Sequence, residues 1–482
     1  MKQVRFLLFV LLLATVSVHA QVGIGTLTPA NSSQLDITST ARGLLIPRMT
    51  EVQRTAIASP AEGLLVYQTD LSSGFYVFKG GIWKILLSDE SGWSTTGNAG
   101  TVDGTHFIGT TDNVPFNIRV NNQKAGRIDP TLYNSFYGLL AGNSNFSGNQ
   151  NSATGYNALF SNVSGNNNTA SGYNALQNNQ GASSNTAFGA NSLQGNTYAQ
   201  QNVAIGNDAL YTQSLTNGNT PWNTNNVAVG FQSLYSNQPS TFANGMNNTA
   251  VGTQALYSND IGSQNTAVGY QSLFSNSSFV GSSNTAIGFQ ALYSNTTNLN
   301  TAVGYLALRE NTTGLLNTAV GSYALWGNIS GQHNVAVGVF ALLQNKGQYN
   351  TAVGTDAMNK NTTGNDNTAF GHKALYLNTT GNGNVAVGDS AGHNNTTSSY
   401  NVFLGHKAGF FETGANKLYI SNSNTTTPLI GGAFSAGTVT INALLTLTPT
   451  TEPTSPVKGM IYFDNGTNKL RCYDGTIWQD LW

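Results

Sequence analysis

Between Asn134 and about Phe410, polar and apolar residues recur in a short unit that begins with a strict alternation. The unit reads Asn-Thr-Ala-Val-Gly and often continues with an aromatic residue and a Leu at position 9, as in the copies at Asn265, Asn300 and Asn334. Positions 1, 3 and 5 would point to one face, and positions 2, 4 and 6 to the other. A period of two is typical of a β-strand. Each unit therefore predicts a strand followed by a return segment.

The leading Asn recurs at a nearly constant interval. Of the fifteen spacings, ten are 17 residues, two are 16 and three are longer. The sixteen copies begin at residues 134, 151, 168, 185, 202, 226, 248, 265, 284, 300, 317, 334, 350, 367, 384 and 401. Such a period indicates one small unit per repeat, stacked on its neighbours. Seventeen residues suffice for two short strands and two turns, so we predict an all-β fold, a parallel β-roll or β-solenoid of about sixteen 17-residue coils.

The unit also predicts features of a single coil. The Gly at position 5 indicates a bend or a close approach of two backbones, and Asn-Thr-Thr-Gly, as at Asn311, Asn361 and Asn378, predicts the closing turn. Stacked coils about 4.8 Å apart would give a rod of roughly 75 Å, with Asn side chains forming amide ladders. A coil this thin buries little apolar area, which favours a trimer.

Two similar segments frame the repeats. Pro60 to Trp83 and Pro456 to Trp478 both read as a β-hairpin closed by Trp, and we expect a capping or trimerisation module at each end of the stack, although a β-module of no special role remains an alternative. Thr50-Glu-Val-Gln53 is a capping box that predicts a short helix ended by Pro60.

The predicted organisation has six parts. They are a signal peptide (1–20), an N-terminal β-rich module with a short helix (21–130), the β-roll repeats (134–410), a post-repeat β segment (411–447), a linker rich in Thr and Pro (448–456) and a C-terminal β-hairpin cap (457–482).

The first part predicts export. Met1 to Ala20 has a basic start, an apolar core and a small-x-small end, which indicates a secretory signal peptide cleaved near Ala20. No later stretch has the length and hydrophobicity of a membrane span, so we expect a secreted or outer cell-surface protein without a transmembrane span.

Composition narrows the class further. Only 8% of residues are charged, against about 25% in an ordinary domain, yet 39% are hydrophobic and 10% aromatic, which argues against disorder. The net charge of −1 gives no reason to expect nucleic acid or anionic membrane partners. Cys472 is the only cysteine, so no intramolecular disulfide can form, and we expect a buried structural thiol.

No residues combine into a credible active site, so we predict no enzymatic activity, no cofactor and no metal. The constellation closest to a metal site is His372, Asp389 and His406, all at position 6 of successive coils. Stacking would place the two histidines roughly 10 Å apart, too far to share one ion. A solvated polar column is the favoured interpretation.

The longer coils are better candidates for recognition. Insertions after Asn202 and Asn226 carry Tyr211, Trp222 and Phe242, and insertions in solenoids emerge as loops on one side. These three residues are the candidate ligand contacts. An exposed Trp there would contact a glycan or protein; in the alternative interpretation it covers the edge of the coil.

The residues also resemble known families. The repeats resemble the heads of trimeric autotransporter adhesins (the YadA-like β-roll) and repeat-containing surface proteins of Bacteroidetes type, with related modules in phage tail fibres. The segments Val22–Pro29, Gly43–Met49, Thr96–Gly100 and Asn416–Ile420 are similar to the flanking segments of such proteins. The chain departs from the autotransporters because it has neither a heptad stalk nor a C-terminal barrel anchor. The resemblance implies a homotrimer.

The predicted function is that of an exported structural or adhesive cell-surface fibre, which binds host protein, matrix or glycan through multivalent repeats. A ligand-free spacer or surface-layer component is the alternative. A monomeric solenoid that binds ice or glycan is a third possibility, because position 2 supplies a column of Thr interrupted by Val.

Overall fold

The computed structural model describes residues 21–87, 97, 99–105, 107–213, 215, 218–276 and 281–481. The predicted signal peptide, Met1 to Ala20, lies outside the described residues. The chain forms two compact units, and the boundary between them in the sequence falls between Gly109 and Thr110. Strands dominate both units, and all-β is confirmed as the fold class.

The first unit contains a short parallel pair and a four-stranded sheet. The pair is β1 (Val22–Ile24) with β2 (Leu35–Ile37), and the sheet has the order β3 (Arg48–Met49), β4 (Leu65–Gln68), β5 (Gly74–Lys79), β6 (Ile82–Leu87). β4, β5 and β6 run antiparallel, so the hairpin predicted at this end is confirmed and has a third strand that contains Trp83.

Helix α2 (Glu51–Thr55) begins at the predicted capping box, in which Thr50 and Gln53 exchange two hydrogen bonds. The helix ends at Thr55 and not at Pro60 as predicted: Ile57 donates only to the Arg54 carbonyl, three residues back, and Ser59 adopts a positive φ of 49°. On its inner side Arg54 is buried and donates from Nε to Gln68 Oε1 at 2.7 Å.

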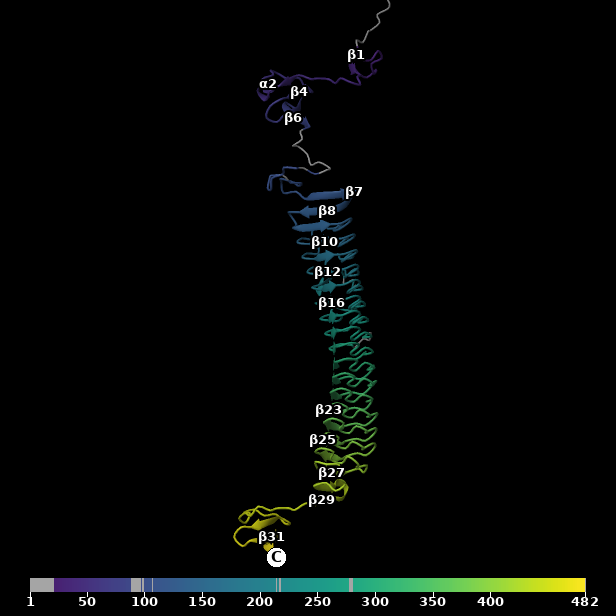
Figure 1. Cartoon of the computed structure of the whole chain (residues 1–482), viewed down its shortest axis with the longest axis vertical. Coiled ribbons are helices and arrows are strands. Elements are labelled where there is room, and N and C mark those ends of the chain that lie inside the picture. Colours follow the sequence, from purple (N-terminus) through teal and green to yellow (C-terminus); the bar gives the residue numbers. More distant parts are fainter. Residues whose placement is uncertain are drawn as a thin grey trace, which may run out of the picture. The chain divides into compact units, whose positions relative to one another are not determined.

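The second unit is built around one long ladder of strands (Figure 1). Its sixteen repeat strands, all within the described residues, are β9 (Asn134–Tyr137), β10 (Ser152–Thr154), β11 (Thr169–Ser171), β12 (Thr186–Phe188), β14 (Val203–Ile205), β16 (Val227–Val229), β17 (Thr249–Val251), β18 (Thr266–Val268), β19 (Thr285–Ile287), β20 (Thr301–Val303), β21 (Thr318–Val320), β22 (Val335–Val337), β23 (Thr351–Val353), β24 (Thr368–Phe370), β25 (Val385–Val387) and β26 (Val402–Leu404). Neighbours pair in parallel with position 3 aligned on position 3. The predicted solenoid of about sixteen coils is confirmed.

Further strands extend both ends of this ladder, antiparallel at the first end and beginning with one more parallel strand at the last. β7 (Phe116–Val120) and β8 (Gln123–Asp129) precede β9, and β27 (Lys417–Ile420), β28 (Ile430–Ala433) and β29 (Thr438–Ile441) follow β26, with a 3-10 turn η1 (Phe434–Ala436). The capping or trimerisation role expected of the Trp hairpins stays a prediction, because the structure shows only their strand pairing. In the described part of the chain those modules form separate sheets, and β7–β8 and β27–β29 protect the end strands.

Most coils contain one strand and not two, which corrects the predicted pair of strands; a second short strand occurs only in the coils that begin at Asn185 and Asn202. The return segment is a run of turns in which positions 7 and 9 adopt positive φ, as in Gln271 (52°) and Leu273 (51°). Its N–H groups bond to neighbouring coils: Gln271 donates to the Thr253 carbonyl at 3.0 Å and Leu273 to the Ala291 carbonyl at 2.9 Å. These bonds hold a Leu in a backbone region that costs roughly 1–2 kcal/mol.

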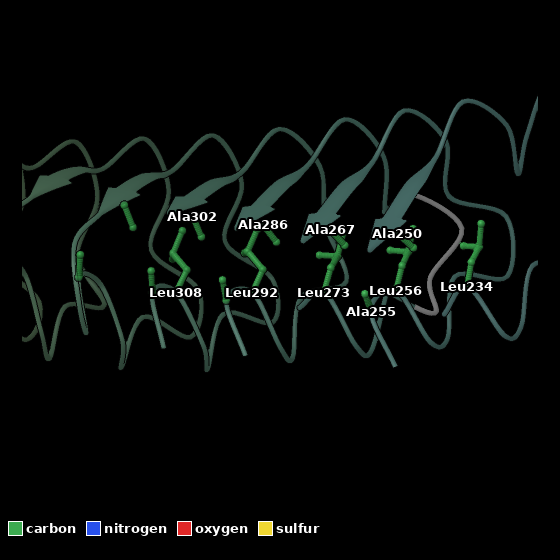
Figure 2. Packing of buried hydrophobic residues seen from close by; sticks show 14 of the residues in the cluster. Leu234, Ala250, Ala255, Leu256, Ala267, Leu273, Ala286, Leu292, Ala302 and Leu308 are labelled. Atoms are coloured by element: carbon green, nitrogen blue, oxygen red, sulfur yellow. The ribbon is translucent and has the colours of Figure 1, made fainter. Parts of the chain in front are cut away.

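The core is a thin apolar layer between strand and return segment. Ala at positions 3 and 8 and Leu at position 9 are fully buried in most coils and form one continuous cluster. Figure 2 shows this arrangement, with Ala302 on the strand and Leu308 on the return segment pointing toward each other. Burial of each Leu contributes about 1.5–3 kcal/mol, so the coil is stabilised mainly by this residue.

Two columns of buried Asn run inside the stack and confirm the predicted amide ladders. In the first, at position 1, the backbone N–H of Asn317 donates to Asn300 Oδ1 at 3.0 Å, and its Nδ2 donates to the Gly331 carbonyl at 2.8 Å. In the second, at position 12, Asn328 Nδ2 donates to Asn311 Oδ1 at 2.9 Å. The ladders satisfy buried polar groups that would otherwise oppose folding.

The position-5 glycines mark a close approach of backbones, as predicted. Gly321 has φ 134°, and a Cβ built on it would lie 2.6 Å from the carbonyl oxygen of Gly338 in the next coil. Side chains are therefore excluded from this column, and the coils stack closely here.

The C-terminal sheet repeats the design of the first unit. It consists of β30 (Ile461–Asp464), β31 (Lys469–Tyr473) and β32 (Trp478–Asp480). Its register matches that of the N-terminal sheet, because Tyr473 pairs with Trp478 as Phe78 pairs with Trp83. Cys472 is half-buried in β31, not fully buried as expected.

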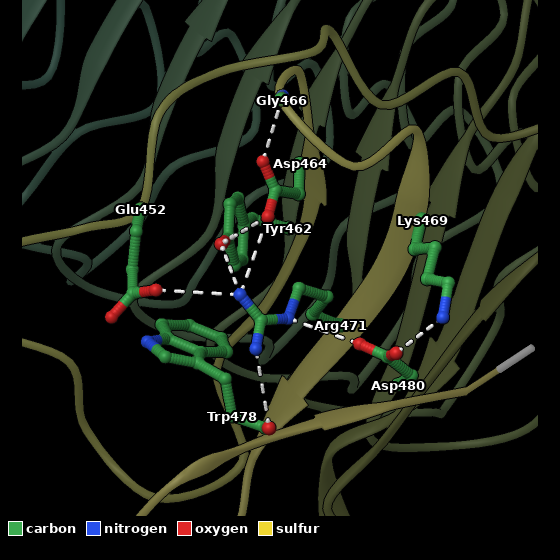
Figure 3. A network of polar contacts seen from close by, with 8 residues as sticks. All are labelled: Glu452, Tyr462, Asp464, Gly466, Lys469, Arg471, Trp478 and Asp480. Atoms are coloured by element: carbon green, nitrogen blue, oxygen red, sulfur yellow. Dashed lines mark hydrogen bonds and ion pairs between the residues drawn. The ribbon is translucent and has the colours of Figure 1, made fainter.

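A central arginine ties this small sheet together. Figure 3 shows Arg471 bonded through its guanidinium to Glu452, Tyr462, Asp464, Asp480 and the carbonyl oxygen of Trp478, at 3.2–3.4 Å. In the first unit Arg54 comes from helix α2 and not from a strand, with its guanidinium carbon 4.1 Å from the ring centre of Tyr76.

Candidate binding surface

The outward side of the repeat strands forms a continuous surface, which we call the strand face: the side chains at positions 2, 4 and 6 of the sixteen coils. Position 2 is Ser, Thr or Val throughout. Position 4 is apolar or aromatic in fourteen coils, and none of these side chains is buried: Tyr137, Phe188, Ile205, Val229, Val251, Val268, Ile287, Val303, Val320, Val337, Val353, Phe370, Val387 and Leu404. Their exposed fraction reaches 38% at Val320 and 59% at Phe188.

Position 6 adds aromatic rings along one border of the strand face. Tyr270, Phe289 and Tyr305 stack at centroid distances of 5.3 Å, and Tyr156 stacks on Tyr173 at 5.5 Å. The spacing follows from the coil repeat, because identical positions lie one strand apart.

A second aromatic column lies on the return segment, at position 10. Five rings stack in parallel at 5.0–5.1 Å: Tyr211, Tyr235, Tyr257, Phe274 and Tyr293. The guanidinium of Arg309 then lies 5.1 Å from the ring centre of Tyr293. Because the ring faces cover one another, only ring edges reach solvent. A sugar stacks on an aromatic face, so this column is a poor sugar platform.

The structure places the three predicted contact residues in two different settings. Tyr211 begins the position-10 column, half-buried against Tyr235. Trp222 lies in β15 (Trp222–Asn223), which pairs with β13 (Ala199–Gln200), and its exposed fraction is only 8%.

Phe242, from the second insertion, is the exposed member of the set. It contacts the Trp222 ring edge-on, with the ring centroids 6.2 Å apart, and is 50% exposed. Trp222 packs with Tyr198 and Ala199 in a small separate core. This burial favours the interpretation that Trp222 covers the edge of the coil.

The polar column predicted near the C-terminal end is present. Asp389 lies between two histidines, with Oδ1 2.8 Å from His372 Nδ1 and Oδ2 3.6 Å from His406 Nε2. The hydrogen bond from His372 lowers the pKa of Asp389 below its usual value. All three side chains are about half exposed. Among the described residues, no group of three or more His, Cys, Asp and Glu has the geometry of a metal site.

Sequence reasoning missed a hollow on the return side of the stack. The hollow is open and has a volume of about 440 Å³. Trp326 and Ile329 supply its apolar part, and Glu310, Gln344 and Lys346 supply polar groups. Trp326 replaces the stacked Tyr or Phe of the position-10 column, which was the sequence signal for this feature.

In the comparison with known proteins, one segment of the chain matches a family model. Residues 23–100 match the family model described as "Phage tail like trimerisation region". No curated protein and no solved structure matches the chain significantly. The matched segment includes most of the first unit and supports a homo-oligomer; together with the solenoid it fits a module of the phage-tail-fibre type and a structural fibre.

The part of the chain that the structure describes holds no helix with the length and hydrophobicity that crossing a membrane requires.

Proposed function

We propose that the chain is an exported, non-enzymatic structural fibre that assembles as a homotrimer and adheres to host protein, matrix or glycan surfaces. The observation that carries the proposal is an uninterrupted parallel ladder of sixteen coils in a chain whose residues 23–100 match a trimerisation region. Export rests on the signal-peptide pattern of Met1 to Ala20.

The interior of the stack supports a mechanical role. Strand bonds, two Asn ladders and bonds between return segments join most coils to the next; the second ladder is interrupted at Gln213. Neighbours are therefore bound at several points around the coil, which resists bending and local opening. A stack bonded in this way suits a rod that holds two points apart.

Multivalency supports the adhesive part. Repeated surface groups along one rod, present three times in a trimer, turn weak contacts into strong avidity. The hollow at Trp326 offers an apolar surface beside the polar groups of Glu310 and Lys346, which is the usual composition of a small-ligand site. A ligand-free spacer is the alternative: it would have the same stack of coils but would bind no host protein, matrix or glycan.

Assembly is tested on residues 21–482 by sedimentation velocity with light scattering. We expect an elongated trimer, and a monomeric mass would overturn the trimeric fibre. Mass spectrometry of the exported protein tests the leader: an N-terminus at Gln21 supports export, and an intact Met1 in a cytosolic fraction contradicts it.

Adhesion is tested by binding to immobilised glycans and matrix proteins. The Trp326→Ala variant should lose binding, whereas Trp222→Phe, in the buried insertion core, should keep it. If the intact trimer binds no tested surface, the spacer interpretation replaces the adhesin, and the fibre remains.

A further inference from the structure

The sheet of the solenoid is apolar on both sides but covered on only one. On the inner side, Ala319 is buried against the Leu residues of the return segment. On the outer side, Val320 is exposed. Parallel sheets occur almost only with both faces covered. The strand face is therefore a surface that lacks its cover in the single chain.

The strand face differs in composition from the turns. Positions 2 and 4 carry no charged residue in any of the sixteen coils. The turns after the second Asn ladder expose mostly polar residues, as at Thr313, Ser330 and Thr363, and apolar ones in only a few coils, as at Val163 and Ile329. Solvation explains the polar residues of the turns, but it does not explain an uncharged column that is apolar in fourteen of the sixteen coils and interrupted by Thr154 and Ser171.

The size of this surface fits a stable interface. Sixteen strands about 4.8 Å apart, most of them three residues or about 10 Å long, give about 750 Å². Monomeric proteins rarely expose an apolar patch larger than about 300–600 Å², and a standard protein interface buries about 800 Å² per partner. The strand face is thus large enough to hold chains together by itself.

The chain itself indicates what covers this face. Residues 23–100 match a trimerisation region, so two further copies are held next to each chain at high local concentration. Positions 2 and 4 carry no charge and would not be repelled by identical columns; the charged residue of the strand face, Asp389, lies at position 6 on its border. We propose that the strand faces of three copies pack together around a threefold axis, with position 4 nearest the axis. This inference rests on the proposed homotrimer.

Threefold symmetry makes the contacts heterologous. On either side of the central position-4 column the strand face has different columns, position 2 and position 6. The position-6 column of one copy, which is aromatic in six coils, therefore lies beside the Ser, Thr and Val column at position 2 of the next. At the level of β20 this arrangement brings Thr301 of each copy near Tyr305 of a neighbour, and it does not bring two Thr301 residues or two Tyr305 residues together.

Cysteine cross-linking of the full mature chain tests this arrangement. In a Cys472→Ser background, Thr301→Cys combined with Tyr305→Cys, treated with a short bismaleimide, should give a covalent trimer on a denaturing gel. Each single variant should give little cross-linking. The pair Thr313→Cys with Ser330→Cys, on the turns, is the matched control and should not yield a trimer.

The native mass, measured on the same samples, separates two kinds of failure. A trimeric mass without covalent trimer from the 301/305 pair, or with equal cross-linking of the control pair, would overturn the strand-face interface and leave the trimeric fibre standing. A monomeric mass would overturn the homotrimer and this inference together. A covalent trimer from the 301/305 pair alone supports the interface.

Discussion

The ring of Phe136 occupies the space that a side chain at Gly142 would need: a Cβ built on Gly142 would lie 2.5 Å from the ring. In most other coils the same two positions, 3 and 9, hold Ala and Leu. The large residue has moved from the return segment to the strand. The last repeat coil shows the same exchange, with Phe403 packed over Gly409 and over Gly392 of the coil before. Both end coils are thus filled from the opposite side.

This exchange predicts strong coupling between Phe136 and Gly142. Phe136→Ala should lower the free energy of unfolding by about 3–5 kcal/mol, because it opens a cavity, and Gly142→Leu should also destabilise, because it overpacks the coil. The double variant recreates the Ala and Leu pair of the central coils and should recover much of the loss. Chemical denaturation of all four proteins measures the coupling. Additive losses would show that the exchange is not a packing compensation.

The Asn ladder predicts a large effect from a single amide. Asn317→Ala removes the oxygen that accepts two bonds from Asn334, from its N–H at 3.0 Å and its Nδ2 at 3.1 Å. The backbone N–H of Asn334 then has no partner, whereas its Nδ2 keeps the bond to the Gly347 carbonyl at 2.9 Å; one orphaned buried group costs about 1–3 kcal/mol. Guanidinium unfolding and hydrogen exchange of the adjacent coils should both report the loss. Ser330→Ala, an exposed change in the same coil, should be near neutral, and equal effects would contradict the ladder's role.

The position-5 column predicts that even a methyl group is too large. Gly321→Ala places Cβ against the Gly338 carbonyl oxygen and requires φ 134°, so it should separate two coils and lower the thermal midpoint markedly. The matched control is Gly437→Ala. Gly437 also has positive φ, 63°, but nothing lies within 4 Å of the position that its methyl group would take, so only a backbone cost of roughly 1 kcal/mol remains. Similar losses in both variants would exclude the close-approach explanation.

The His–Asp–His column predicts a small, local pH dependence. The His372 hydrogen bond lowers the pKa of Asp389. Since the folded pKa lies below the unfolded one, ionised Asp389 stabilises the fold above the unfolded pKa, and this contribution is lost as pH falls through the folded pKa. The carboxylate is 42% exposed, so the effect on stability should be slight.

A carbon-13 NMR titration of the Asp389 carboxyl group measures this shift directly. Wild-type protein should titrate below the usual value of 3.8, and His372→Ala should raise the pKa toward it. His393→Ala is the control, because His393 bonds to Asn394 and not to Asp389. An unchanged pKa in His372→Ala would show that the hydrogen bond is not the cause.

Much of the fold could be predicted because stacking translates a sequence period directly into space. Residues that repeat at fixed positions predict the number of coils and the Asn columns. They also predict the close approach at Gly321 and the alternation of inward and outward side chains in the strand that contains Ala319. The return segment could not be predicted. Leu325 at φ 52° contradicts local preference, and only the bonds between coils explain it. Local propensity contains no information about such bonds.

The candidate surface was predicted less well. Trp222 was chosen because it stands out in an insertion, but the structure buries it with Tyr198 and Ala199. The sequence did not predict the strand face, because Val303 and its equivalents are residues that occur in any β-strand, whether the side chain is buried or exposed. Exposure depends on which side the return segment covers, and the period of two does not specify that side.

The uniform register of the ladder has a consequence for how the molecule changes over generations. Asn300, Asn317 and Asn334 offer the same donors and acceptors to their neighbours. If residues 317–333 were deleted, Asn334 would meet Asn300 across a junction chemically like every other. The rod can therefore lengthen or shorten by whole units, in steps of about 4.8 Å, so that unequal recombination within one gene adjusts its reach without a new interface having to evolve.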